Sequence, residues 1–177
     1  KRSRDMTTGV LSAPTNINTG PVFNSTLTSP DNNNVYATHL VGPDGLGNYT
    51  THVFQYSRNT TTGDLTYMGD IPLSGNSGGT FRDPIISADG KDIYVAANIT
   101  SPASYRIYHL SRNLGTGALT YITYITTSST HENLVISNDG LSIYSTSTAY
   151  TFCHHARSPS TGVITASTDT TFVYSPT

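Results

Sequence analysis

The sequence predicts an all-β fold built from repeated four-stranded antiparallel sheets. Two kinds of segment recur along the 177 residues, and each kind combines short apolar runs with turn residues. Val, Ile, Tyr and Thr dominate the runs, as is typical of half-buried strands. No stretch shows apolar residues at the 3.6-residue period of a packed helix. These observations favour repeated sheets over a helical or mixed fold.

The longer recurring segment occurs three times. Its copies are FNSTLTSPDNNNVY (Phe23–Tyr36), FRDPIISADGKDIY (Phe81–Tyr94) and HENLVISNDGLSIY (His131–Tyr144). Each copy reads as a short strand, a Ser-x-Asp-Gly or Ser-x-Asp-Asn turn, and a second strand that ends in an aliphatic–Tyr pair. Asp-Gly supplies the positive φ that tight hairpins need. Each copy therefore predicts one hairpin.

A shorter segment follows each copy and contains a Thr-Gly turn. Its copies are Tyr56–Thr66, Leu110–Thr120 and Ala156–Thr165, and a fourth copy, Arg2–Ser12, opens the chain. The Thr-Gly glycines lie at positions 9, 63, 117 and 162, with spacings of 54, 54 and 45. Propeller blades repeat every 40–50 residues or so, with four strands in each blade. A β-sandwich is the alternative, but it does not repeat its sequence at a fixed period.

The second repeat shows how the strands divide. We predict strands a to d at Pro84–Ser87, Asp92–Ala97, Tyr105–Ser111 and Leu119–Thr126. The whole chain is then one β-propeller segment, residues 1–177, with complete blades at approximately 22–71, 81–126 and 131–168.

The two ends of the chain predict incomplete sheets. Lys1–Gly9 reads as part of a c–d hairpin, and Thr171–Ser175 (TFVYS) reads as a lone strand a. Both ends would expose unpaired strand edges or an uncovered sheet face. Either the chain is a segment of a longer closed propeller, which we favour, or copies complete one another in a ring or filament.

Composition and charge exclude several classes of protein. Charged residues make up only 11%, the net charge is −2, and 12 Tyr and 5 Phe argue against disorder. A charge so close to zero gives no basic surface for nucleic acid. No apolar run approaches the length of about 18 residues needed to span a membrane. A single cysteine, Cys153, excludes an internal disulfide and a multi-cysteine zinc site, and we expect it to be a small buried residue.

The abundance of Ser and Thr suggests a secreted or cell-surface protein. Asn-x-Ser/Thr sequons make candidate glycosylation sites of Asn24, Asn48, Asn59 and Asn98. With 51 Ser and Thr in the chain, chance alone predicts about as many sequons, so they do not establish secretion.

The predicted loops point to one face of the propeller. The a–b and c–d turns are short, whereas the b–c and d–a connections are long and lie together on the opposite face, where binding usually resides. Strand a is innermost, so residues just before it surround the central mouth. The polar residues at these positions are Asn24, Arg82, Asp83, His131, Glu132 and Asn133.

These mouth residues have two possible roles, catalysis or the lining of a water-filled channel. An Arg, a His and a carboxylate together can polarise a carbonyl and move a proton, so Arg82, His131 and Glu132 are candidate catalytic residues. Asp83 and Asn133 are candidate ligand-binding residues. Alternatively, these side chains line a water-filled channel, and Arg82 pairs with Asp83 or Glu132.

Two segments also carry a family resemblance. SADGKDIYVAAN (Ser87–Asn98) and YRIYHLSRNLGTGALTYI (Tyr105–Ile122) resemble the Tyr-Val-Thr-Asn repeat. They are similar to the seven-bladed lactonase-type propellers, which include 6-phosphogluconolactonase-like and carboxymuconate-cyclase-like proteins. The resemblance implies a full propeller of about twice this length, with His, Arg and Glu in its mouth. It assigns no individual catalytic residue.

Three other motifs predict neither a catalytic nucleophile nor a metal site. Gly75–Gly79 (GNSGG) matches G-x-S-x-G but lacks the strand–turn–helix context of a hydrolase. His154 and His155 point to opposite faces of a strand, so one metal ion does not readily take both. Asp31–Asn34 lacks the following Gly and the distant Glu of a calcium loop and reads as an a–b turn. We expect neither metal nor cofactor.

The sequence thus predicts an extracellular propeller module for binding or assembly. Its partner would be another copy or the remaining blades of a longer chain, and a small molecule or carbohydrate would be its ligand. The alternative is part of a lactonase-like hydrolase or cyclase that acts at the mouth through Arg82, His131 and Glu132. Whether the chain is an enzyme stays open.

Overall fold

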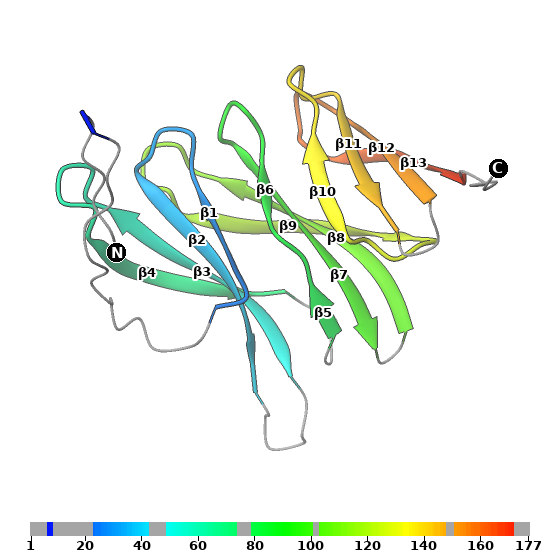
Figure 1. Ribbon diagram of the computed structural model, residues 1–177, viewed down its shortest axis with the longest axis horizontal. Coiled ribbons are helices and arrows are strands. Elements are labelled where there is room, and N and C mark those ends of the chain that lie inside the picture. The colour runs from blue at the N-terminus through cyan, green and yellow to red at the C-terminus, as the bar shows by residue number, and fades with distance from the viewer. Residues whose placement is uncertain are drawn as a thin grey trace.

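Three antiparallel sheets make up the computed structural model (Figure 1). The structure describes residues 7–8, 23–42, 49–73, 79–100, 103–147 and 151–171. These described residues contain no helix, and hence none long and apolar enough to cross a membrane. The predicted all-β architecture of three four-stranded propeller blades is confirmed.

The first sheet has the strand order β1-β2-β3-β4. Its strands are β1 (Ser25–Thr28), β2 (Asn34–Val41), β3 (Thr50–Arg58) and β4 (Leu65–Pro72). The register of β2 on β3 is regular over all eight pairs, from Asn34 opposite Ser57 to Val41 opposite Thr50.

Two short strands form the inner edge of the second sheet. β5 (Gly79–Phe81) and β6 (Ile85–Ile86) both pair with β7 (Asp92–Thr100), followed by β8 (Ala103–Arg112) and β9 (Leu119–Thr127). Pro84 lies between β5 and β6, and it has no backbone N–H to donate to a neighbouring strand. The predicted strands b, c and d are confirmed, each extended by one to three residues.

The third sheet has the order β10-β11-β12-β13. Its strands are β10 (Asn133–Ile136), β11 (Ser142–Thr146), β12 (Thr151–Arg157) and β13 (Ile164–Thr171). Thr171 ends the outer strand β13, where it pairs with Thr151, so it does not begin a separate inner strand as the sequence predicted. The rest of that predicted strand, 172–175, lies outside the described residues, as do 1–6 and Gly9 of the predicted N-terminal hairpin.

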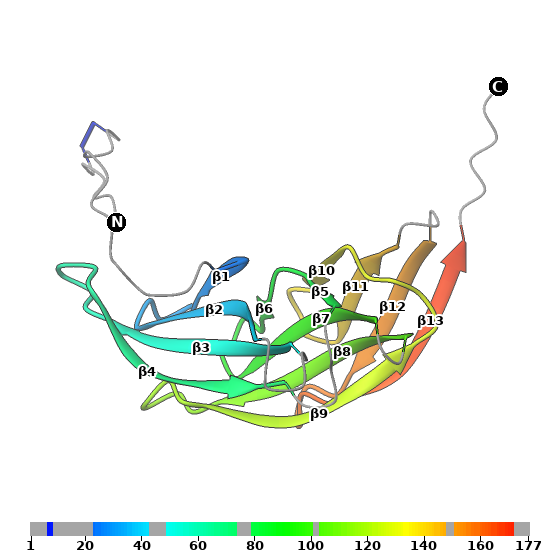
Figure 2. The same cartoon turned by 90° about the horizontal axis from the view of Figure 1, so that it is seen from below.

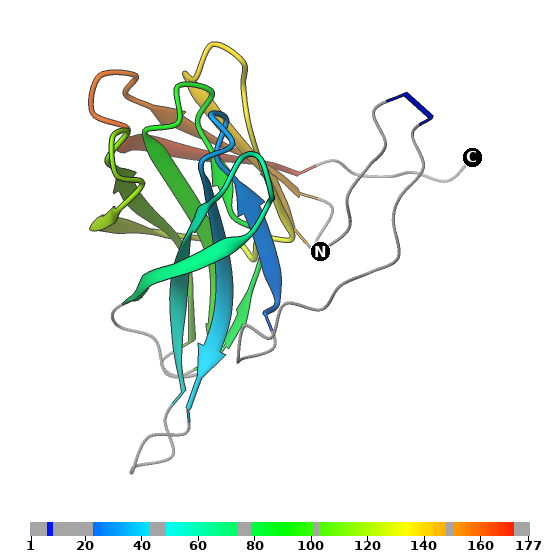
Figure 3. The ribbon, with the colours of Figure 1, turned by 90° about the vertical axis from the view of Figure 1, so that its left-hand side faces the viewer.

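The three sheets fan out around a common axis. Figure 2 shows β1, β6 and β10 along the inner, concave side, and β4 and β9 on the outer side. Figure 3 shows the same sheets stacked one behind another rather than lying edge to edge. Every sheet therefore presents its faces to its neighbours, as propeller blades do, and not to a facing layer as in a sandwich.

The Ser-x-Asp motif caps each a–b turn. The hydroxyls of Ser29, Ser87 and Ser137 donate to the Oδ1 atoms of Asp31, Asp89 and Asp139 at 2.5, 2.6 and 2.5 Å. Each carboxylate also accepts a backbone N–H two residues further on. This side chain–backbone bonding explains why the turn recurs with the same residue types.

Two apolar clusters hold the sheets together. The cluster between the first and second sheets contains buried residues such as Val53, Leu73, Val95 and Leu110. The cluster between the second and third sheets is smaller, and its buried members are Tyr94, Ala96, Ile107, Leu134, Ile143 and Ile164. Fully burying one such aliphatic side chain stabilises the fold by about 1.5–3 kcal/mol.

Candidate functional site

At the mouth, on the inner side of the sheets, an ion pair joins the second sheet to the third. Arg82 lies between β5 and β6, and its Nη2 atom donates to Oε1 of Glu132 at 2.7 Å. Its Nε atom donates to the carbonyl oxygen of His131 at 3.0 Å. Both side chains of the pair are 30% exposed. The structure therefore brings together Arg82, Glu132 and the backbone of His131 just before β10.

The imidazole of His131 does not join this pair. Its ring is fully buried, and its two nitrogens lie 2.8 Å from Ser145 Oγ and 2.6 Å from Thr127 Oγ1. A proton carrier for a substrate in the mouth needs a nitrogen within reach of that substrate. The geometry thus separates the predicted catalytic trio into a surface pair and a buried histidine.

The other predicted mouth residues lie at the surface. Asp83, Asn133 and Asn24 are exposed, and Asn133 is the first residue of β10. The backbone N–H of Asn24 donates to the carbonyl of Thr38, which fixes the entry of the chain into β1. None of the described residues forms a group of three or more His, Cys, Asp or Glu that could hold a metal ion.

The four sequons differ in accessibility. Asn24 and Asn59 are exposed, although the Oδ1 atom of Asn59 accepts the backbone N–H groups of Thr61 and Thr62. Asn98 is half-buried, and its Oδ1 accepts the N–H of His131. Asn48 lies outside the described residues, as do Gly75–Gly78 of the GNSGG motif.

The tandem histidines point to opposite sides of β12, as alternation predicts. His155 is fully buried between the second and third sheets. His154 lies on the other face, where its Nε2 is 3.0 Å from Ser142 Oγ and its ring contacts Tyr144. Cys153 is buried, as predicted.

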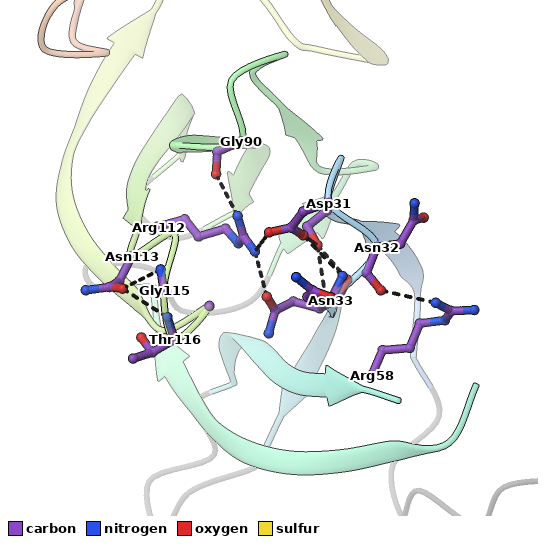
Figure 4. A network of polar contacts seen from close by, with 12 residues as sticks. Asp31, Asn32, Asn33, Arg58, Gly90, Arg112, Asn113, Gly115 and Thr116 are labelled. Atoms are coloured by element: carbon purple, nitrogen blue, oxygen red, sulfur yellow. Dashed lines mark hydrogen bonds and ion pairs between the residues drawn. The ribbon is translucent and has the colours of Figure 1, made fainter. Parts of the chain in front are cut away.

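A buried arginine joins the first sheet to the second (Figure 4). Arg112 Nε donates to the Tyr36 hydroxyl at 2.7 Å, and that hydroxyl donates to the carbonyl of Gly117 at 2.6 Å. Arg112 Nη2 donates to Asp31 Oδ2 at 2.7 Å and to Asn34 Oδ1 at 2.6 Å. We call this the first polar network; its members are Asp31, Asn34, Tyr36, Gly90, Arg112 and Gly117.

The same arrangement joins the second sheet to the third. Arg157 Nε donates to the Tyr94 hydroxyl at 2.6 Å, and that hydroxyl donates to the carbonyl of Gly162 at 2.5 Å. Arg157 Nη2 lies 2.5 Å from Asp92 Oδ2, and Nη1 donates to the carbonyl of Gly140 at 2.7 Å. We call this the second polar network; its members are Asp92, Tyr94, Gly140, Arg157 and Gly162.

Burial and charge shift the protonation of these groups. Burial raises the pKa of Tyr94 to about 12, so its hydroxyl keeps its proton and can donate it. Burial also raises the pKa of Asp92, but hydrogen bonds from His109 and Arg157 outweigh it, and the net pKa lies below the ordinary value. The hydroxyl of Ser29, followed by Arg112, lowers the pKa of Asp31 to about 2. Both networks therefore hold a charged arginine–carboxylate contact.

Each of the two outer sheets carries one half of the same arrangement, whose other half does not occur among the described residues. Tyr144 of the third sheet matches Tyr36 and Tyr94 in the repeat, but it is 41% exposed, whereas the other two are fully buried. Arg58 of the first sheet matches Arg112 and Arg157. Among the described residues its side chain makes one hydrogen bond, from Nη1 to the carbonyl of Asn32 at 3.1 Å.

The sequence carried a signal for these networks that the sequence analysis did not use. Arg58, Arg112 and Arg157 each stand five residues before the glycine of a Thr-Gly turn. Each repeat also supplies a tyrosine after the Ser-x-Asp turn. The recurrence of both residue types at fixed places predicts a contact between neighbouring repeats.

A surface hollow of about 380 Å³ lies beside the first polar network. Its lining residues are Pro30, Asp31, Asp89, Gly90, Arg112 and Leu114. Asp31 and Asn32 form an a–b turn here, as predicted, with Asn32 at a φ of 59°.

The fold has counterparts among solved structures. Neither a protein-family model nor a curated protein matches the sequence. A protein assigned as a 6-phosphogluconolactonase from Bacteroides uniformis matches 82% of this chain, with a TM-score of 0.68 and 19% identity. A protein of the same assignment from Bacteroides fragilis matches 79%, with a TM-score of 0.66 and 17% identity.

The periplasmic gluconolactonase PpgL of Pseudomonas aeruginosa matches 82% of this chain, with a TM-score of 0.60 and 14% identity. The matches cover 39% and 36% of the two Bacteroides chains and 53% of PpgL. The chain thus shares the fold of lactonase-type propellers and spans about half, or less than half, of their length. The resemblance found in the repeat is confirmed at the level of fold.

Proposed function

We propose that this chain is a propeller module for binding and assembly, whose two outer sheets are completed by further blades of the same kind. The observation that carries the proposal is the unpaired half of a polar network on each outer sheet. Among the described residues, no arginine binds Tyr144 as Arg112 and Arg157 bind Tyr36 and Tyr94, and no tyrosine binds Arg58.

The missing partners can be described atom by atom. An incoming blade would place an arginine Nε on the Tyr144 hydroxyl and an Nη2 on Asp139, as Arg112 does with Tyr36 and Asp31. Tyr144 would donate to the carbonyl of that blade's Thr-Gly turn. At the other end, a tyrosine and an Asn or Asp of a preceding blade would bind Arg58, and the tyrosine would donate to Gly63.

Apolar exposure on the outer sheets supports the same proposal. Val135, Tyr144 and Phe152 lie on the outer face of the third sheet and are all exposed. On the first sheet, exposed Tyr67 and half-buried Phe23 and Phe54 gather around the buried ring of Tyr56. Contiguous apolar surface of this kind marks an interaction site, since covering it is favourable.

Hydroxyl-radical footprinting of the native particle tests the proposal. We expect Tyr144 to be protected to the level of buried Tyr94, while Tyr124, on the outer strand β9 of the second sheet and 38% exposed, reacts more. Equal reactivity of Tyr144 in the native particle and in the isolated 177-residue chain at high dilution would overturn the proposal. Native mass spectrometry then distinguishes the source of the added blades: a multiple of one chain mass means copies, and a larger single chain means further blades of the same polypeptide.

The second candidate function is sugar-lactone hydrolysis at the mouth. The Arg82–Glu132 pair favours it. The half-buried guanidinium of Arg82 can stabilise a developing oxyanion, and the carboxylate of Glu132 can take up a proton. The likeness to gluconolactonase structures supports the choice of lactones as substrates. Asp83 and Asn133 lie at the surface beside this pair in sequence and stay predicted ligand contacts.

Turnover of a gluconolactone by the native particle tests this candidate. We expect Glu132→Gln and Arg82→Ala to lower kcat/KM at least about 100-fold, as removal of a general acid–base group or an oxyanion donor does. Lys91→Ala, at an exposed position after the a–b turn of the second sheet, is the control and should leave turnover unchanged. Unchanged turnover in the Glu132 and Arg82 variants would exclude catalysis by the pair.

We also propose an extracellular location, which only the abundance of Ser and Thr supports. Among the described sequons, Asn24 and Asn59 have exposed side chains, and we expect these two to carry glycans. Peptide mapping of the natural protein before and after glycosidase treatment tests this: unmodified Asn24 and Asn59 would contradict it.

A further inference from the structure

The outer edge of the second sheet is one long strand, β9 (Leu119–Thr127). β9 is the last strand of its sheet, and no described strand pairs with its far side. In an antiparallel pair, about half of the residues of a strand turn their backbone N–H and C=O groups away from the partner strand. β9 therefore presents a row of backbone donors and acceptors on the outer side of the three sheets (Figure 2).

The outer strands of the other two sheets carry features that prevent pairing with another chain, whereas β9 does not. β4 contains Gly69, Asp70 and Pro72, and β13 contains Asp169. Charged residues, proline and irregular backbone are the means by which proteins keep an edge strand from pairing. β9 has the sequence LTYITYITT, with no charge, no glycine and no proline. Its β-branched and aromatic residues are those that favour strand pairing.

Neighbouring residues hold β9 in place on both faces of its sheet. Tyr121 packs against the apolar cluster between the first and second sheets, and Ile125 packs against the cluster between the second and third. A strand that already has its bound shape loses little conformational freedom when another strand pairs with it. The open edge of β9 is therefore preorganised for a partner strand.

The second half of β9, residues 123–127, is complementary to itself. It lies beyond the bulge of this sheet and pairs residue by residue with β8. If two copies of this half pair antiparallel about Ile125, the opposed residues are Thr123 and Thr127, Tyr124 and Thr126, and Ile125 with itself. Opposed residues then differ by an even number in the sequence, so their side chains share a face and their outward backbone groups meet. Thr opposite Thr, and an aromatic residue opposite a β-branched one, are pairs that stabilise neighbouring strands.

Charge favours the pairing of β9 with β9 over a symmetric pair of either other outer strand. β9 brings no charge to such a pair. Two β4 strands would bring Asp70 of each copy together, and two β13 strands would bring Asp169 of each copy. Like charges across neighbouring strands are destabilising. Among the three outer strands, β9 is therefore the one that accepts its own copy without repulsion.

We propose that β9 is an interaction surface for a second copy of this chain, whose β9 pairs with it antiparallel about a two-fold axis at Ile125. The pairing joins the second sheets of two copies into one continuous sheet, and each copy uses the same residues, as in other two-fold dimers. The contact is one strand edge, smaller than a standard protein interface, so the dimer is weak and forms at high concentration. The proposal does not depend on which blades cover the outer sheets, because these blades bind sheet faces and not the edge of β9.

Hydrogen exchange of the full chain, at low micromolar and at near-millimolar concentration, tests the proposal. Amides of β9 should exchange more slowly in the concentrated sample, because N–H groups that face water in the monomer are bonded in the dimer. A chain concentration about ten times Kd should slow their exchange on the order of tenfold. Amides of β4 and β13 should exchange equally at both concentrations.

Thr126→Glu should remove this protection and raise Kd about tenfold, since each new carboxylate lies near its symmetry mate in the dimer. Thr126 is exposed, and Arg106 lies opposite it on β8, so the folded chain accommodates the acid. Thr66→Glu, the same change at an exposed position of β4, is the matched control and should leave Kd unchanged.

Three results would overturn the proposal: a chain that stays monomeric at near-millimolar concentration, a dimer whose protected amides lie outside β9, or equal effects of Thr126→Glu and Thr66→Glu. A further test needs no variant. In a concentrated mixture of labelled and unlabelled natural chains, intermolecular NOEs between Tyr124 and Thr126 should appear, and their absence would also overturn the proposal. None of these results changes the protection expected for Tyr144, so the proposed function is tested separately.

Discussion

The hydroxyl of Tyr94 donates a hydrogen bond to the carbonyl of Gly162 at 2.5 Å, across the boundary between two sheets. Arg157 Nε donates to the same hydroxyl from the other side. One phenol group therefore ties the second sheet both to the c–d turn and to the last residue of β12 in the third sheet. The bond from Tyr36 to Gly117 repeats this relationship one sheet earlier.

Tyr94→Phe should destabilise the chain by about 1–3 kcal/mol, because the ring stays but a buried N–H of Arg157 and the Gly162 carbonyl lose their partner. Urea unfolding at pH 7 measures the loss. Tyr144→Phe is the matched control in the isolated chain: its hydroxyl is on an exposed ring, so its effect should stay within about 0.5 kcal/mol. Equal losses in both variants would contradict the role given to Tyr94.

Gly162→Ala should destabilise the chain by more than about 2 kcal/mol. The residue has a φ of +72°, and an added Cβ would lie 2.3 Å from Asp92 Oδ1. The substitution therefore combines backbone strain with displacement of a buried carboxylate. Gly115→Ala is the control: its φ lies outside the left-handed region, and the nearest atom to its Cβ, Asn113 Oδ1, is 3.4 Å away. A tolerated Gly162→Ala would contradict the close approach of the two sheets.

Arg157→Lys should cost about 3–5 kcal/mol, although it preserves the charge. A lysine ammonium cannot reach Tyr94, Gly140 and Asp92 from one planar group, so Asp92 keeps a poorer partner in a buried position. Arg58→Lys on the first sheet changes an arginine whose side chain makes one hydrogen bond among the described residues, to the carbonyl of Asn32, and should have little effect in the isolated chain. Thermal unfolding of the two variants side by side measures the difference.

Asp31 should contribute to stability in an acid-dependent way. Its pKa falls from 3.8 to about 2 in the folded chain, mainly through the Ser29 hydroxyl, so the unfolded state binds its proton first on acidification. The contribution is present above about pH 4 and is lost as the pH falls toward 2. Asp31→Asn should remove this part of the acid dependence, and Asp139→Asn, an exposed carboxylate, should remove less. An NMR titration that gives Asp31 its ordinary pKa would contradict the prediction.

Local sequence patterns were sufficient for the strands and turns of this fold. Strands of the second repeat were predicted to within three residues at each end, because alternating β-branched and aromatic residues and Asp-Gly turns act within one hairpin. The sequence also placed Arg82 beside Glu132 as an option, and the structure has this pair.

The hydrogen-bond partners of the buried polar groups could not be predicted from local sequence patterns. Tyr94 and Arg157 are 63 residues apart, and only the stacking of two sheets brings them within 2.6 Å. His131 lies just before β10, and its ring is fully buried. The direction of a side chain just before a short strand depends on the packing of the neighbouring sheet, which local alternation does not encode.

The sequence by itself determined the repeat, the four strands of each sheet, the turn types and the near-neutral, polar composition. Each of these depends on interactions within about fifty residues, which a repeat displays directly. Only the tertiary structure decided that the repeated tyrosines and arginines meet between sheets and that His131 and His155 are fully buried. It also decided that Tyr144 and Arg58 have no such tyrosine–arginine contact among the described residues. Burial and hydrogen-bond partners depend on how whole sheets stack, because a side chain leaves water only when a distant segment covers it.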